Sequence, residues 1–344
     1  MGPYAMLVML TSLAIGTLMT LSSYHWLLAW AGLEISTLAI IPMMTQHPHP
    51  RTTEAATKYF LTQATASALI LFSSLTNAWS TGQWEIKEMT PPASNMLTIA
   101  LAMKLGLAPM HFWLPEVIQG LDLTTGLILS TWQKIAPMAL LYLTSASLNT
   151  TLLTILALAS TLLGGWGGLN QTQLRKILAY SSIAHLGWMV IIMPFSPILA
   201  MLNFTIYVTL TSTLFLTMKA TNTTKINTLT MTWTKTPVLA TLSALTLLSL
   251  GGLPPMTGFV PKWLILQELT KQNLAPTAMM IAFSALLGLF FYLRLTYTMS
   301  LTYSPNNPTT TISWRYKTNQ TTFLLALMMI LSMMLLPLTA TMKL

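Results

Sequence analysis

Long apolar segments separated by short polar connections make up almost the whole chain. Eleven of these segments are long enough to cross the hydrocarbon core of a bilayer, since a straight helical crossing needs about 20 residues. The pattern therefore predicts an all-α polytopic membrane protein with about eleven transmembrane helices in one domain, residues 1–344. The expected spans are residues 3–21, 24–45, 52–79, 93–119, 122–145, 149–171, 174–193, 196–221, 236–272, 276–300 and 320–341.

Two spans, 93–119 and 236–272, are too long for one straight helix, and both contain internal prolines. A proline inside a helix removes a backbone hydrogen bond and interrupts the helix. We therefore expect both spans to be discontinuous helices. The connections 80–92, 222–235 and 301–319 are rich in Pro, Asn, Thr and charged residues, which is typical of surface loops.

The two broken spans contain similar sequences. Leu105-Gly-Leu-Ala-Pro109 resembles Leu250-Gly-Gly-Leu-Pro254, and a second proline follows in each copy. Because the copies lie five spans apart, the second would have inverted topology, as in transporters built from inverted repeats. This interpretation predicts five-helix repeats over residues 1–148 and 149–300, followed by a C-terminal helix over 320–341. The alternative is two chance breaks in a sequence of biased composition.

Basic residues of the connections are distributed unequally between the two sides of the predicted membrane topology. By the positive-inside rule, the N-terminus should face the interior compartment and the C-terminus the opposite one. The N-terminal side collects Arg51, Arg175, Lys176, Lys219, Lys225, Lys235, Arg294, Arg315 and Lys317, and the other side collects Lys87, Lys271 and Lys343.

The composition excludes several classes of function. Only 7% of the residues are charged, against about 25% in soluble domains. The net charge of +9 comes from scattered residues and not from a basic cluster, which argues against nucleic-acid binding. The chain has no cysteine, so it holds no disulfide and no Cys-ligated iron–sulfur cluster. Its first residues show no basic region or cleavage site, and we expect no signal or transit peptide.

Charged residues inside apolar spans are the strongest candidates for function. A charge at membrane depth costs several kcal/mol on insertion scales and usually marks a pathway for ions or protons. Glu34 lies in the middle of span 24–45 with no basic residue one turn away, and Lys104 in span 93–119 is its natural partner. A pair of this kind that opens and closes acts as a proton switch. The structural alternatives are a neutral packing residue at Glu34 and a lysine that extends to the interface at Lys104.

Two more lysines and two histidines extend this set. Lys134 lies in the middle of its span, one turn before Pro137, and Lys262 directly follows a proline in the second broken span. Lys262 could instead be a helix-end lysine that reaches the lipid headgroups. His111 and His185 would relay protons, because histidine titrates near neutral pH, or would serve only as hydrogen-bonding packing residues.

The acidic residues at the end of span 93–119 have a simpler interpretation. Glu116 and Asp122 flank this end, and we expect them to pair with interfacial cations in a structural role. No spacing of histidines and carboxylates matches a metal site.

Three motifs together resemble a known family. They are Lys104–Gly120, Leu174–Trp188 and Leu250–Trp263, and they are similar to the antiporter-like membrane subunits of proton-pumping NADH:ubiquinone oxidoreductase, respiratory complex I. The resemblance covers the whole chain and is strongest to mitochondrially encoded vertebrate members, which lack three N-terminal helices of their bacterial counterparts.

The resemblance implies a role for each buried residue. Glu34 and Lys104 match the family's acid–lysine pair, and Lys134 matches the central lysine that joins the half-channels. Lys262 matches the charged residue of the second broken helix, near the outlet, where other members carry glutamate. His185 matches a polar residue of the central axis.

The resemblance also implies the setting. The chain would be a subunit of the H⁺-translocating NADH:ubiquinone reductase with no redox site of its own, and partner subunits would hold FMN, iron–sulfur clusters and ubiquinone. Its neighbours would be other membrane-arm subunits, namely NADH dehydrogenase subunits 4 and 4L and accessory subunits, and the lipid bilayer. It would lie in the mitochondrial inner membrane, with the N-terminus in the matrix and the C-terminus in the intermembrane space. A stand-alone cation/proton antiporter, or a structural subunit that only bridges its neighbours, remains open.

Overall fold

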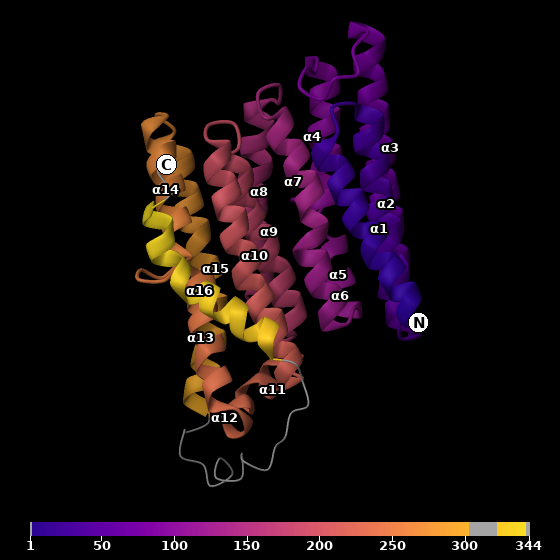
Figure 1. Ribbon diagram of the computed structural model, residues 1–344. Coiled ribbons are helices and arrows are strands. Elements are labelled where there is room, and N and C mark those ends of the chain that lie inside the picture. The colour runs from indigo at the N-terminus through magenta and orange to yellow at the C-terminus, as the bar shows by residue number, and fades with distance from the viewer. Residues whose placement is uncertain (1, 303–321, 342–344) are drawn as a thin grey trace. The chain divides into compact units, whose positions relative to one another are not determined.

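The computed structural model describes residues 2–302 and 322–341, and its regular secondary structure is helical, as the hydrophobic pattern predicts (Figure 1). Five helices in this part of the chain are long and apolar enough to cross a membrane. They are α1 (Pro3–Ser22), α2 (Trp26–Met44), α8 (Thr150–Gly168), α10 (Pro197–Thr221) and α15 (Ala275–Thr302).

The remaining helices differ more in length. They are α3 (Pro50–Thr81), α4 (Pro91–Leu105), α5 (Trp113–Gly120), α6 (Leu123–Ser130), α7 (Trp132–Thr144), α9 (Leu174–Ile192), α11 (Ile226–Thr230), α12 (Thr232–Lys235), α13 (Pro237–Gly251), α14 (Phe259–Lys271) and α16 (Phe323–Thr341).

Both predicted helix breaks are confirmed, because α4 and α5 replace one long span and α13 and α14 replace the other. Two further details were not predicted. The fifth span is interrupted at Thr131, whose side-chain hydroxyl and backbone N–H both donate to Leu127 O, at 2.7 Å and 3.0 Å. The connection 222–235 contains the short helices α11 and α12, and most of the connection 301–319 lies outside the described residues.

The chain divides into two compact units, which we describe separately: Met1–Ser160 with Met193–Pro197, and Thr161–Ile192 with Ile198–Leu344. In the first unit, α1 packs along α2, and α3 packs against α2, α4 and α5 (Figure 1). α1 and α2 are closest at Gly16 and Gly32, where a Cβ atom on either residue would lie 2.7 Å from the carbonyl oxygen of the other. Only glycine permits this approach, and it holds the two backbones together.

In the second unit, α13 packs along α15, and α14 contacts α9 and α15. α9 is buried around almost its whole circumference, as expected for a helix that is apolar on all faces. Thr257, in the break between α13 and α14, donates to Ser332 O on α16 at 3.0 Å. This bond ties the break to the C-terminal helix.

The two breaks are built in the same way. α4 ends at Gly106 with φ +78°, and α13 ends at Gly252 with φ +82°, a left-handed conformation that favours glycine. In each, the glycine N–H bonds to a carbonyl three residues back, and the next N–H bonds to one five residues back, which forms a Schellman cap.

This geometry shifts the alignment of the two breaks by one residue. The equivalent glycines are Gly106 and Gly252, whereas the sequence comparison paired Gly106 with Gly251. In the corrected register, Glu116 corresponds to Lys262.

Candidate functional site

Lys104 and Glu34 form the charged centre of the first unit. Lys104 lies in the last turn of α4 and is 6% exposed, and its Nζ has no hydrogen-bond partner in the part of the chain that the structure describes. Glu34, on α2, is half-buried, and its Oε2 also has no partner. The two groups interact electrostatically but are not hydrogen-bonded to each other. The expected pair is thus present in a separated arrangement.

A small cavity in this unit contains Lys104 and Lys134 in its wall. Lys134 is 2% exposed and lies in the first turn of α7, directly after the interruption at Thr131. Gln133 Nε2 donates to Ser36 O at 2.9 Å and fastens α7 to α2 beside the cavity. The other polar lining residues are Ser36, Thr37, Tyr59 and Gln63. The fold therefore brings two of the predicted lysines to one polar cavity.

Lys262 is the charged centre of the second unit. Its Nζ donates to Gly251 O at 2.8 Å and to Leu250 O at 3.2 Å, and so caps the C-terminal end of α13. A cation is favoured there, because the carbonyl end of a helix carries partial negative charge. The amine is therefore directed at backbone carbonyls of its own unit. This contact argues against the alternative in which Lys262 reaches the lipid headgroups.

A second cavity joins Lys262 to His185. His185, on α9, is 9% exposed and lies 5.5 Å from Tyr207, measured between ring centroids. The cavity is also lined by the hydroxyl residues Thr161, Ser181, Ser284 and Tyr292. The second unit therefore repeats the arrangement of the first, in which a buried cation shares a polar cavity with a second proton-accepting group.

The chain matches known protein families along nearly its whole length. Residues 23–289 match the family model described as NADH:quinone oxidoreductase/Mrp antiporter, TM, and residues 289–343 match the model of the NADH dehydrogenase subunit 2 C-terminus. NADH-ubiquinone oxidoreductase chain 2 of Xenopus laevis is 64% identical over 340 residues, which cover 98% of this chain and 99% of that protein. The chain belongs to the NADH-ubiquinone oxidoreductase chain 2 family. It is a subunit of NADH:ubiquinone oxidoreductase, respiratory complex I, and the resemblance found in its motifs is confirmed.

Further relatives agree with this assignment. The chain 2 protein of Latimeria chalumnae is 61% identical over 343 residues, covering 99% of each chain. A chain of respiratory complex I from Thermus thermophilus has a TM-score of 0.83 and 26% identity over 98% of this chain and 80% of that chain. A chain of the Mrp complex from Dietzia shares the fold, with a TM-score of 0.78 and 18% identity over 86% of this chain and 60% of that one.

Other predicted residues lie away from the two cavities. His111 is buried against Phe112, 4.3 Å between ring centroids, and does not line the cavity of Lys104. Asp122 lies 3.8 Å from the exposed His47. Among the described residues, no group of three or more histidine or acidic side chains could hold a metal ion.

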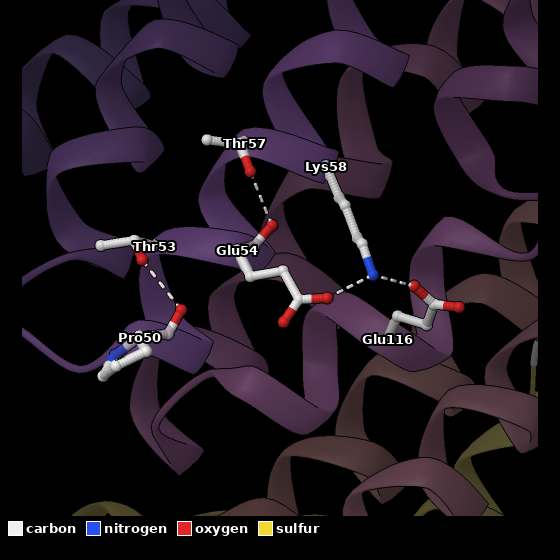
Figure 2. Close-up of polar contacts among 6 residues, drawn as sticks. All are labelled: Pro50, Thr53, Glu54, Thr57, Lys58 and Glu116. Atoms are coloured by element: carbon white, nitrogen blue, oxygen red, sulfur yellow. Dashed lines mark hydrogen bonds and ion pairs between the residues drawn. The ribbon is translucent and has the colours of Figure 1, made fainter.

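Glu116 belongs to an ion-pair cluster that joins α3 to α5. Figure 2 shows Lys58 between Glu54 and Glu116, and its Nζ lies 2.6 Å from a carboxylate oxygen of each. Glu54 and Lys58 are four residues apart on α3, whereas Glu116 is on α5. Glu116 thus forms an ion pair, as expected. Its partner is Lys58, a residue to which the sequence analysis assigned no role.

The sequence did not reveal several polar groups of the cavities. Tyr59 and Gln63 are four residues apart on α3, so they share one helix face, and that spacing was the available signal. Tyr292 stands in the apolar run Leu289-Phe-Phe-Tyr-Leu293, and no pattern distinguishes it from a packing residue.

Proposed function

We propose that this chain translocates protons along buried acid and lysine side chains, driven by electron transfer in other subunits of complex I. The single observation that carries the proposal is the pairing of buried proton-binding groups in the walls of two small cavities, Lys104 with Lys134 and His185 with Lys262. An apolar membrane subunit with a purely bridging role has no physical reason to bury lysines in this way.

The first unit would act as the switch. A buried amine holds its proton more firmly when a carboxylate is near and releases it more readily when it is alone. Within the described residues Lys104 Nζ has no hydrogen-bond partner, and it interacts electrostatically with Glu34, so a change in the distance between the two groups would change how firmly Lys104 holds its proton. A movement that separates the two would send the proton across the cavity to Lys134.

The second unit would act as the exit. The carbonyl end of α13 stabilises a charged Lys262, which makes this amine a suitable acceptor for a proton that arrives through His185. Protons would move from the matrix to the intermembrane space of mitochondria, in a chain of eleven membrane crossings with two inverted repeats. The N-terminus would lie in the matrix. Subunits 4 and 4L, accessory subunits and lipids would surround the chain, and FMN, iron–sulfur clusters and ubiquinone would belong to partner subunits.

The test is Lys104→Met in intact complex I. The substitution retains an unbranched side chain and removes the proton-binding group, so we expect a large loss of protons pumped per electron in reconstituted vesicles. Lys271→Met is the matched control, because Lys271 is an exposed lysine of α14, 3.4 Å from Glu268. An unchanged ratio of protons pumped to electrons transferred in the Lys104→Met variant would refute the proposal. A loss of assembled complex with unchanged pumping per turnover would favour the bridging role.

A further inference from the structure

Tyr292 is a buried polar residue to which the proposed path assigns no role. Its side chain is 2% exposed, and its hydroxyl oxygen makes no hydrogen bond of standard geometry within the described residues. Most buried polar atoms have a partner, and an unsatisfied hydroxyl costs about 1–3 kcal/mol, so its presence requires an explanation. Because Tyr292 lines the cavity that contains Lys262 and His185, the explanation lies in this cavity.

The position of Tyr292 connects the two sides of the cavity. On one side, its ring lies against Gly251, where a Cβ atom would be 3.7 Å from Tyr292 Cδ2, and the Gly251 carbonyl accepts from Lys262. On the other side, its hydroxyl approaches Ser181 on α9. Ser181 lies four residues before His185, on the same helix face.

Neighbouring aromatic residues show that packing alone does not require this hydroxyl. Phe291, the preceding residue, is equally buried without a polar atom and also lines the cavity. Tyr207 is buried beside His185, but its hydroxyl is hydrogen-bonded to Ser182 and it does not line the cavity. Tyr292 alone among these three brings an unsatisfied hydroxyl to the cavity.

We propose that Tyr292 is a positioning residue for proton transfer between His185 and Lys262, and that its hydroxyl orders water in the cavity between them. A phenol hydroxyl donates one hydrogen bond and accepts others, so it can hold a water chain in one direction. The imidazolium of His185 would release one proton to water, and the neutral amine of Lys262 would accept one from the other end of the chain. The tyrosine ends unchanged, and no other bond forms or breaks. This inference rests on the proposed function and adds a residue to it.

The test compares Tyr292→Phe, Tyr207→Phe and Lys262→Met in intact complex I. Three quantities are measured for each variant in H₂O and in D₂O. They are the content of assembled complex, its rate of thermal inactivation, and the number of protons pumped per second per complex. We expect Tyr292→Phe to assemble and to resist heat at least as well as the wild type, because the substitution keeps the ring and breaks no hydrogen bond to a described residue. Its pumping rate should fall at least threefold, with a changed solvent isotope effect. Tyr207→Phe should lose heat resistance through its broken bond to Ser182 and keep its rate per complex.

The outcomes separate the two proposals. If Lys262→Met lowers pumping and Tyr292→Phe does not, Tyr292 is a packing residue and the present inference is overturned. If neither variant changes pumping, the proposed function itself fails. A density map of intact complex I that resolves ordered water gives a second measurement, independent of any variant. Water within hydrogen-bond distance of Tyr292 Oη supports the inference, and a dry cavity overturns it.

Discussion

Replacement of Gly252 by alanine should have two effects that can be measured separately. It strains the backbone at this position, and it displaces the side chain of Lys262. The left-handed conformation at φ +82° costs a non-glycine residue about 1–2 kcal/mol. Part of this is offset, because alanine also restricts the unfolded chain. In addition, the new Cβ atom would lie 2.8 Å from both Cδ and Nζ of Lys262. Ordinary contacts begin near 3.5 Å, so the amine must move by about 0.7 Å.

The displacement of the amine would weaken its bond to Gly251 O, which is 2.8 Å long. A hydrogen bond to a charged group contributes about 1.5–3 kcal/mol, and about 1.4 kcal/mol corresponds to a tenfold change in rate. We therefore expect Gly252→Ala to lower the rate of proton pumping per assembled complex about tenfold. Its heat resistance should fall through the backbone strain and through the weakened hydrogen bond of Lys262.

Gly82→Ala is the matched control. Gly82 ends α3 with φ +74° and the same capping N–H bond, but no atom lies within 4 Å of the position that a Cβ atom would occupy. It should lose only the part of the stability that backbone strain explains, and it should keep its pumping rate. The reasoning would be refuted if the two variants pump equally, or if Gly252→Ala slows pumping further in a Lys262→Met background, where no amine remains to be displaced.

Two further predictions concern stability, measured by thermal unfolding of the solubilised complex. Asn77→Ala should cost about 2–3 kcal/mol, because the buried Asn77 side chain donates to Glu88 O and accepts from Thr90 N, both at 2.9 Å, and alanine leaves both unsatisfied. The exposed helix cap Asn149→Ala should cost only about 1 kcal/mol, and equal losses would contradict this account. Lys58→Met should change the unfolding temperature far less than Asn77→Ala does, because the Lys58 side chain is 41% exposed and water screens both of its ion pairs. A loss as large as that of Asn77→Ala would show that the carboxylates are desolvated.

Most of the helical framework could be predicted from the sequence, because apolar runs of the required length specify membrane helices whatever their partners are. The two broken helices were also predictable, since proline removes a backbone donor wherever it stands. The interruption at Thr131 was not, because no helix-breaking residue stands there and the nearest proline, Pro137, lies six residues further along the chain. The register of the repeat was misjudged because Gly251 and Gly252 are adjacent, and only the backbone dihedral angles reveal which one ends the helix.

The candidate site was predictable only in part. Lys104, Lys134 and Lys262 could be named because charge is rare in this chain, and rarity at membrane depth is a signal in itself. The hydroxyl and amide groups around them are common residues that tertiary packing selects. Tyr292 illustrates the limit, since nothing in its sequence neighbourhood shows that its hydroxyl is buried at a cavity wall.

The corrected register of the two copies has a consequence for how each broken helix is fastened. At equivalent positions, Glu116 holds α5 through an exposed ion pair with Lys58, whereas Lys262 holds α14 through backbone carbonyls. Dissolved ions screen exposed charge pairs over about 8–10 Å, but they have little access to an amine enclosed against a helix end. Higher ionic strength would therefore weaken the contact that holds α5 and leave the contact that holds α14 intact, so that the two broken helices respond differently to the same change in the surrounding solution.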